Sequence, residues 1–208
     1  MKTQPNKLPT AGDIAAHVDY MRSFGYVAPA QRVRIAIPDA AAVLRAYLSY
    51  FLGPRMQWLP EYDRVAEWLT DNHGLGLLCA GDCGRGKSLL CERVLPLIIH
   101  RHYRLVVKTV QATRLPFCGD EWLAYRLVMV DDVGTEDVSV RFGNRRDMFA
   151  ELVDAAEREG HLLLLTCNYG TDGLTQRYGL RVVDRLRGLV RGVRFKGPSL
   201  RAEGKNNR

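Results

Sequence analysis

The pattern of hydrophobic and polar positions changes near residue 72. Before it, apolar residues recur at three- and four-residue spacing, which predicts amphipathic helices over Asp13–Tyr20, Pro38–Phe51 and Pro60–Leu69. Two of these helices start at a proline, which is favoured in the first helical turn. The first part of the chain is therefore expected to be helical, with residues 1–11 disordered.

After residue 72, short apolar runs alternate with amphipathic stretches. Runs that are apolar throughout are typical of strands covered on both faces, as in a parallel sheet. The sequence predicts helices over Ser88–His102 and Phe142–Glu159, and strands over Leu75–Ala80, Arg104–Val110, Leu127–Val133, His161–Cys167 and Val193–Phe195. This alternation favours an α/β fold with a parallel sheet flanked by helices.

The composition is that of one folded domain. The chain has 208 residues, of which 47% are hydrophobic and 25% charged, so it is too short for two full domains and too apolar for a disordered chain. No apolar run approaches the roughly 18 residues of a membrane span, and the first residues lack the apolar core of a secretion signal. The five cysteines form no CxxC pair, so we interpret them as reduced thiols and expect a cytoplasmic protein with no membrane partner.

The net charge of +7 is concentrated at one end of the sequence. Residues 181–208 contain nine basic and two acidic residues, whereas residues 1–180 balance to zero. A concentrated basic end indicates a polyanion as partner, while a solvated tail accounts for the last few residues equally simply.

One motif predicts a nucleotide site. The segment GDCGRGKS matches the phosphate-binding pattern G-x-x-x-x-G-K-[ST], with an apolar strand before it and an amphipathic helix after it. Glycines let backbone N–H groups turn toward phosphates, the lysine neutralises the β- and γ-phosphates, and the serine hydroxyl binds Mg²⁺. The expected cofactors are therefore ATP and Mg²⁺. The expected nucleotide-binding residues are Gly81, Asp82, Cys83, Gly84, Arg85, Gly86, Lys87 and Ser88.

The third predicted strand contains two adjacent acids. Asp131 is expected to hold Mg²⁺ together with Ser88. Asp132 stands where many such ATPases place a glutamate that orients the attacking water, and its shorter side chain predicts slow hydrolysis. Glu136 could substitute for that glutamate, although a solvated loop acid is the favoured interpretation. The alternative for the acid pair is a strand-end turn without catalysis.

Polar residues later in the chain complete the candidate catalytic set. Asn168 follows the next strand, where it is expected to sense the γ-phosphate or the attacking water, unless it serves only the Asn-Tyr-Gly turn. Arg181 and Arg185 are four residues apart and share a helix face, from which an arginine acts in cis or on a neighbouring subunit's nucleotide. A basic surface helix explains the same spacing.

These segments, in this order, resemble the DnaC/IstB group of AAA+ ATPases, which contains bacterial and phage helicase loaders and transposition helpers. The resemblance covers roughly Trp58–Arg201 and rests on GDCGRGKS, LVMVDD, LLLLTCN, YGLRVVDRLRG and FKGPSLR. The resemblance implies a P-loop NTPase of the AAA+ (ASCE) class, with a parallel five-stranded sheet and no C-terminal helical lid. Numbered along the chain, the strands are expected in the order 5-1-4-3-2.

The same resemblance implies roles for residues and for domains. Arg185 corresponds to an arginine finger acting in trans, Arg181 to its companion and Asn168 to the sensor. Residues 1–57 correspond to a helical extension that binds a partner, 58–201 to the ATPase domain and 202–208 to a flexible basic tail. The implied partners are a hexameric replicative helicase, single-stranded DNA and further copies of this chain on DNA.

The predicted function is that of a slow ATPase, stimulated by DNA or its partner, which binds Mg-ATP and single-stranded DNA and delivers the replicative helicase. An IstB-like transposition helper, assembling on duplex DNA, is the alternative with the same fold. A small-molecule or nucleoside kinase is a second, although the chain lacks the Arg-rich lid that such enzymes use. A non-hydrolysing ATP-dependent adaptor is a third, because Asp132 stands in place of a glutamate.

Overall fold

The computed structural model describes residues 8–136, 139–141 and 144–201. The chain forms two compact units, Met1–Ala30 and Gln31–Arg208. The predicted tail at 202–208 lies outside the described residues. Within the described ranges, no helix is both long enough and apolar enough to cross a bilayer.

Residues 8–30, the described part of the first unit, contain one helix, α1 (Ala11–Arg22). Thr10 caps its start, because Thr10 Oγ1 accepts from Asp13 N at 3.2 Å while Asp13 Oδ2 accepts from Thr10 N at 2.8 Å. No residue of α1 is buried. Local capping thus fixes the start of a helix whose apolar side chains lie outside any core.

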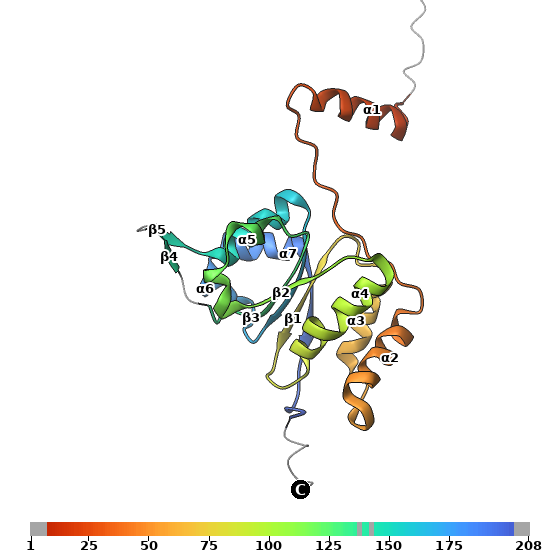
Figure 1. Cartoon of the computed structure of the whole chain (residues 1–208), viewed down its shortest axis with the longest axis vertical. Coiled ribbons are helices and arrows are strands. Elements are labelled where there is room, and N and C mark those ends of the chain that lie inside the picture. The colour runs from red at the N-terminus through yellow and green to blue at the C-terminus, as the bar shows by residue number, and fades with distance from the viewer. Residues whose placement is uncertain (1–7, 137–138, 142–143, 202–208) are drawn as a thin grey trace, which may run out of the picture. The chain divides into compact units, whose positions relative to one another are not determined.

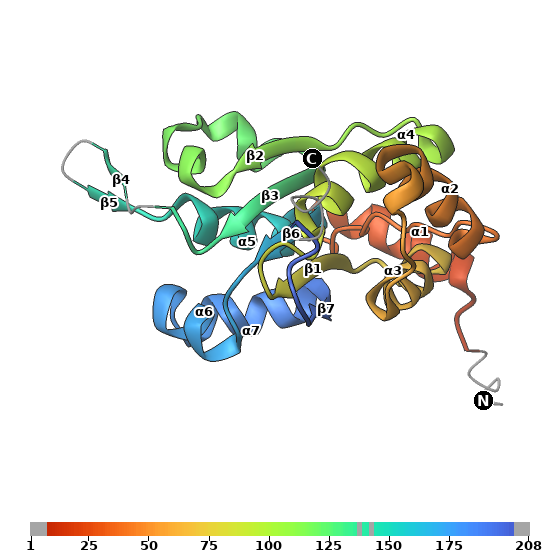
Figure 2. The same cartoon turned by 90° about the horizontal axis from the view of Figure 1, so that it is seen from below.

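The second unit is built on a five-stranded parallel sheet. Its strands are β1 (Gly76–Gly81), β2 (Lys108–Gln111), β3 (Leu127–Val133), β6 (Leu162–Cys167) and β7 (Val190–Phe195). They pair in the order β2-β3-β6-β1-β7, and every neighbouring pair is parallel (Figures 1 and 2). The predicted fold class and strand order are confirmed. All five strands therefore present their carboxyl ends at the same edge of the sheet.

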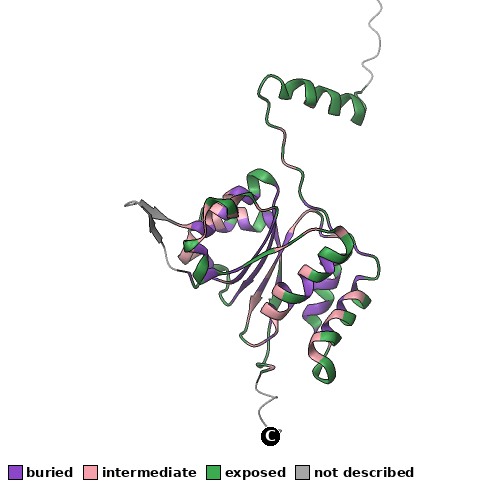
Figure 3. Cartoon of the chain, viewed as in Figure 1, coloured by how far each residue is buried: buried purple, intermediate pink, exposed green. Residues whose placement is uncertain are grey.

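Helices cover both faces of this sheet, so the central strands are buried (Figure 3). One face packs against α2 (Ala40–Leu52), α3 (Pro60–Thr70), the π-helical segment η2 (Leu89–Val94) and α4 (Leu95–Tyr103). The other face packs against α5 (Met148–Glu159) and α7 (Leu180–Leu189), with α6 (Thr171–Tyr178) next to α7. Because side chains alternate along a strand, Leu164 enters the first core and Leu165 the second.

The largest corrections to the predicted element boundaries are at the starts of β2 and α5. β2 begins at Lys108 rather than at Arg104, because Arg104 adopts a left-handed backbone (φ +57°) and ends α4 by donating its N–H to His100 O. α5 begins at Met148 rather than at residue 142, since Asp147 caps it by accepting from Ala150 N at 3.1 Å. The antiparallel strands β4 (Ser139–Arg141) and β5 (Asn144–Arg146) precede it. The remaining short helical segments are η1 (Gly53–Arg55), η3 (Ala112–Phe117) and η4 (Asp120–Ala124).

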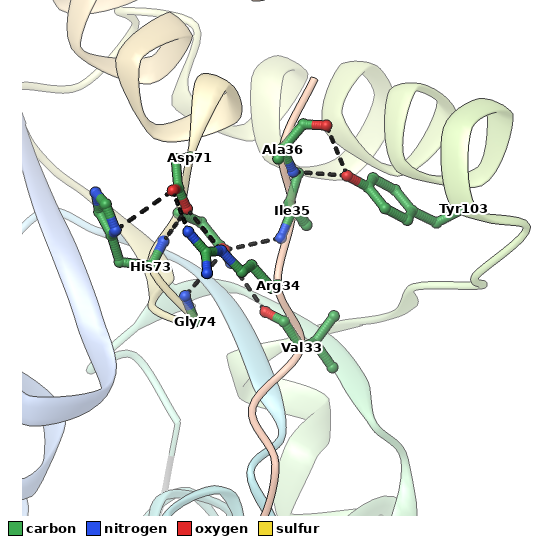
Figure 4. A network of polar contacts seen from close by, with 9 residues as sticks. Val33, Arg34, Ile35, Ala36, Asp71, His73, Gly74 and Tyr103 are labelled. Atoms are coloured by element: carbon green, nitrogen blue, oxygen red, sulfur yellow. Dashed lines mark hydrogen bonds and ion pairs between the residues drawn. The ribbon is translucent and has the colours of Figure 1, made fainter. Parts of the chain in front are cut away.

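An extended segment, residues 31–37, lies along the end of α3 (Figure 4). Asn72 fixes its position, because Asn72 Oδ1 accepts from Ile35 N at 2.8 Å and Asn72 Nδ2 donates to Val33 O at 3.1 Å. Alternate residues of the segment are buried, namely Val33, Ile35 and Ile37. The segment belongs to the second compact unit, which begins at Gln31.

Candidate nucleotide-binding site

The P-loop, residues 81–88, connects β1 to the helical segment that starts at Lys87. It lines a cavity of about 580 Å³, a size typical of small-molecule sites. All eight residues predicted to bind nucleotide lie in this loop, and those from Cys83 to Ser88 line the cavity. Gly84 has a left-handed backbone (φ +76°), and a Cβ placed on it would lie 2.0 Å from Ser199 Oγ, so only glycine fits there.

Lys87 is the centre of the polar contacts at this loop. The side chain is nearly buried, with 5% exposed, and Nζ donates to Gly81 O at 2.8 Å, to Asp82 O at 2.7 Å and to Asn168 Oδ1 at 2.9 Å. An ammonium group has three N–H donors, so all of them are used. A phosphate that binds Lys87 must therefore replace at least one of these acceptors. Asn168 is the acceptor that a side-chain rotation can remove.

Asn168 links Lys87 to Asp132. Its Nδ2 donates to Asp132 Oδ1 at 3.2 Å while its Oδ1 accepts from Lys87. Asp132 adopts a left-handed backbone (φ +57°), a conformation that costs a residue with a Cβ roughly 1 kcal/mol. Its N–H donates to Thr166 Oγ1 at 2.7 Å. The structure therefore brings the predicted sensor, the predicted water-orienting acid and the P-loop lysine into one hydrogen-bonded chain.

Asp131 lies beside this chain and is 4% exposed. Its Oδ1 accepts from Thr166 Oγ1 at 2.6 Å and its Oδ2 accepts from Gln111 Nε2 at 3.1 Å. Gln111 also donates to Glu92 Oε1 at 2.8 Å, and burial together with the charge of Asp131 raises the pKa of Glu92. We call the set Lys87, Gln111, Asp131, Asp132, Thr166 and Asn168 the strand-end network.

The residues predicted to hold Mg²⁺ fit that ion. Mg²⁺ prefers oxygen ligands and takes one or two from the protein, the rest coming from phosphates and water. Ser88 lines the cavity, and the Asp131 carboxylate is held in one orientation by two donors. Within the described residues, no group of three or more His, Cys, Asp or Glu side chains could hold a metal by itself. Ser88 and Asp131 would thus supply two oxygen ligands, and phosphates and water would supply the others.

On its other side the P-loop is held by a buried ion pair. Arg85 and Glu61 are 7% and 8% exposed, and Arg85 Nη2 lies 3.2 Å from Glu61 Oε1. Glu61 Oε1 also accepts from Lys196 N at 2.9 Å. Neighbouring Tyr62 lines the cavity, and burial raises its pKa to about 12, so it is a neutral hydroxyl at physiological pH.

The chain that follows β7 runs directly over the loop. Gly197 N donates to Asp82 Oδ2 at 2.9 Å, and Leu200 N donates to Gly84 O at 3.0 Å. Leu200 and Arg201 line the nucleotide cavity. We call Glu61, Arg85 and residues 195–200 together the P-loop brace.

The two predicted catalytic arginines lie on α7, away from this cavity. Arg185 forms ion pairs with Asp154 and, at 2.9 Å, with Glu157 of α5, and the hydrogen bond to Asp154 raises the pKa of Arg185. Arg181 is exposed and forms no ion pair with any described residue. Neither arginine is among the described residues that line the cavity of the same subunit. This arrangement therefore does not favour an action of either arginine on the nucleotide bound to its own subunit.

The interpretation of Glu136 as a solvated acid was wrong. Glu136 is 5% exposed, its Oε2 accepts from Gly134 N at 2.9 Å, and its Oε1 accepts from the Tyr178 hydroxyl. The pKa of the Tyr178 hydroxyl is raised, mainly by burial and secondly by this hydrogen bond. The Glu136 side chain thus anchors the loop after β3 to α6.

Sequence reasoning missed Glu61, Gln111 and Thr166 as parts of the site. Gln111 and Thr166 stand at or next to the carboxyl ends of β2 and β6, a position that could have marked them, because ligands of parallel sheets bind at that edge. Glu61 carried no comparable signal, since an acid in the first turn of a helix is ordinarily a solvated partner of the helix dipole.

A five-stranded parallel sheet in this order, with a P-loop after β1 and paired acids at the end of β3, defines the P-loop fold of AAA+ proteins. The structure of the DnaC helicase loader is similar at a TM-score of 0.56 and 17% identity, covering 73% of this chain and 99% of that one. The structure of DnaI is similar at a TM-score of 0.50 and 16% identity, covering 93% and 87%. No protein-family model and no curated protein matches the sequence. The chain therefore has the fold of DnaC-like AAA+ proteins.

Proposed function

We propose that this protein is an ATPase of the helicase-loader type. The observation that carries the proposal is the hydrogen-bonded chain Lys87–Asn168–Asp132 beside the P-loop cavity. Lys87, Ser88 and Asp131 hold Mg-ATP, while Asp132 and Asn168 orient the attacking water. The bound Mg²⁺ supplies charge neutralisation at the β- and γ-phosphates. The likeness to DnaC, a helicase loader, supports a role in DNA replication.

The strand-end network explains how nucleotide binding prepares hydrolysis. A γ-phosphate that binds Lys87 displaces the Asn168 oxygen from the ammonium, because the lysine has no fourth donor. Asn168 then has a free acceptor for a water, and its Nδ2 remains bonded to Asp132. Asp132 accepts the proton of that water. Because aspartate is one methylene shorter than glutamate, hydrolysis by a single subunit is expected to be slow.

A neighbouring subunit completes the site in this proposal. An arginine supplied in trans stabilises the charge of the transferring phosphoryl group. Arg181 is exposed and available, whereas Arg185 has to leave Asp154 and Glu157 before it reaches another subunit. The Arg185→Ala variant should bind ATP normally but lose the rise of turnover with protein concentration. Arg187→Ala, on the same helix and exposed, is the matched control. Concentration-dependent turnover that survives in Arg185→Ala would remove Arg185 from this role.

The partners in this proposal are single-stranded DNA, a hexameric replicative helicase and further copies of the chain. Residues 1–57 carry the helicase contact, and residues 58–201 carry ATP hydrolysis. Capture of a replicative helicase by the full chain, in parallel with capture of a transposase, tests this assignment. Binding of the transposase alone would favour the transposition helper with the same fold.

The first experiment is ATP turnover measured with and without single-stranded DNA across a range of protein concentrations. Turnover that depends on DNA and rises cooperatively supports the loader assembly. Tight ATP binding without phosphate release at any concentration supports the non-hydrolysing adaptor, and Asp132→Glu then becomes the variant to test for gain of hydrolysis. Transfer of the phosphate to a nucleoside instead of water would replace the proposal by a kinase.

A further inference from the structure

A groove rich in basic residues lies on the outer side of the P-loop brace. It has a volume of about 560 Å³ and is formed between α3 and β7, which is an edge strand of the sheet. Glu61 is its one acidic residue among those the structure describes. Its basic lining residues are Arg64, Arg85, Arg191, Arg194 and Lys196. The groove is separate from the nucleotide cavity, but Arg85 lines both.

Most of these cations are available to a ligand. Arg64, Arg194 and Lys196 are exposed, and none of them forms an ion pair with a described residue. Arg191 pairs with Glu67 at 2.7 Å, and both side chains are partly exposed. An exposed pair of this kind contributes little energy, so an incoming anion can replace the carboxylate. The groove therefore presents an excess of unneutralised positive charge.

Arg85 gives a second, independent indication of a ligand. Its guanidinium is buried, and its Nε has no hydrogen-bond partner among the described residues. A buried donor without an acceptor is unfavourable, because it has lost its hydrogen bond to water without gaining another. An anion bound in the groove would place negative charge next to the buried Arg85 guanidinium.

We propose that this groove binds the phosphodiester backbone of single-stranded nucleic acid and transmits its occupancy to the P-loop through Glu61 and Arg85. Arginine binds phosphate oxygens with two parallel N–H groups, which favours phosphates as the ligand. Arg194 and Lys196 lie along an extended edge segment opposite Arg64 of α3, so the cations line both walls of an open channel. A linear chain of phosphates matches such a channel.

The route to the P-loop is short. Glu61 Oε1 accepts both from Arg85 Nη2 and from the backbone N–H of Lys196. A phosphate that moves Lys196 or attracts Arg85 therefore changes the contacts of one carboxylate that holds the loop. By linkage, nucleotide in the cavity must change the affinity of the groove by the same factor.

The inference rests on the proposed ATPase function, so the test measures nucleotide and DNA binding separately. The full chain is titrated into a fluorescent single-stranded oligonucleotide at several salt concentrations, and into a fluorescent ATP analogue. The groove variant is Arg64→Glu with Arg194→Glu. The control variant is Arg101→Glu with Arg158→Glu, which changes the net charge equally at exposed positions outside the groove.

The groove variant should lose about tenfold or more in oligonucleotide affinity, and its salt slope should fall by about 1.4 if two phosphate contacts are lost. The control variant and the ATP-analogue affinity of both variants should stay within about twofold of the parent chain. Equal losses in both variants would overturn the groove, because they would show a general charge effect. Failure of the parent chain to bind the ATP analogue would instead contradict the proposed function.

The transmission is tested on the parent chain and on Glu61→Gln, whose fold is checked by thermal unfolding. Saturating oligonucleotide should change the ATP-analogue affinity of the parent chain by about fivefold or more, with the reciprocal change of oligonucleotide affinity. In Glu61→Gln both factors should approach one while the oligonucleotide still binds. Independent binding of the two ligands in the parent chain would overturn the transmission without needing the variant.

Discussion

The two sides of the P-loop are built in opposite ways. On the side of β3 and β6, the strand-end network joins Lys87 to Asn168 and Asp132 through hydrogen bonds that a phosphate can replace. On the side of β7, the P-loop brace holds the loop through the buried pair Glu61–Arg85 and through backbone donors, contacts that the nucleotide is not expected to replace. In the proposed function, one side therefore responds to the nucleotide, while the other keeps the loop in the shape that the nucleotide requires.

This difference has a physical origin in hydrogen-bond supply. A side-chain amide such as Asn168 has both a donor and an acceptor on a rotatable group, so it can exchange partners at small cost. The brace uses main-chain N–H groups from residues 196–200 and a carboxylate that is almost fully buried. Breaking one of those contacts leaves a buried polar group unpaired. Variants on the two sides should consequently fail in different ways.

The largest effect is expected from Lys87→Ala. Removing the ammonium takes away the charge that neutralises the β- and γ-phosphates, so turnover should fall by at least about 10³-fold. The fold should persist, because the carbonyls of Gly81 and Asp82 that Lys87 contacts belong to the end of β1 and the loop behind it. Turnover at saturating ATP, together with binding of an ATP analogue, measures the loss. Near-normal turnover would remove the strand-end network from catalysis.

Arg85→Met changes the P-loop brace, and it is expected to lower the free energy of unfolding. It leaves Glu61 buried without its cationic partner, which destabilises a protein by about 3–5 kcal/mol. The double variant Arg85→Met with Glu61→Leu should recover most of that loss, since it removes both charges. Denaturant unfolding of the two variants checks this. Equal stability of the single variant and the parent chain would show that the brace does not hold the loop.

Asn168→Ala should be milder than either of these. It removes the amide that joins Lys87 to Asp132, so kcat should fall by on the order of 10², while ATP affinity and unfolding stability change little. Thr175→Ala, in α6, is a control that removes a side-chain hydrogen bond outside the network. Separate titrations of kcat and of the binding of an ATP analogue distinguish the outcomes. A loss confined to ATP affinity would make Asn168 a binding residue instead.

Most of the strand-end network could be predicted from the sequence, although Gln111 and Thr166 were missed, whereas the contacts of the P-loop brace could not be predicted. Lys87, Asp131 and Asn168 each follow or end an apolar strand, and parallel strands bring their carboxyl ends together at one edge. The brace joins Arg85 to Glu61 and to Pro198, across 24 and 113 residues of sequence. Such contacts depend on how helices and loops pack, for which periodicity carries no signal.

For residues 31–37, the sequence pattern indicates the conformation of the segment but not its location. The alternation of Val33, Ile35 and Ile37 with polar or small residues is typical of an extended segment that is buried on one side. The partner that fixes it, Asn72, is a side chain acting in place of a neighbouring strand. The pattern therefore indicates the conformation of the segment, while its location depends on tertiary structure.

The exposed pair Arg34–Asp71 provides the smallest predicted effect and the reference for the buried pair (Figure 4). Its Arg34 side chain is 68% exposed, and hydrogen bonds from Arg34 and from His73 N lower the pKa of Asp71 to about 2. Because the pKa is lower in the folded state, the pair stabilises the fold above the ordinary pKa near 4, and this contribution is lost as the pH falls toward about 2. Asp71→Asn should thus lower the melting temperature slightly at pH 7 and by less at pH 2, where about half of the Asp71 carboxyl groups are protonated in the folded state. A loss at pH 7 as large as that of Arg85→Met would show that burial does not separate the two ion pairs.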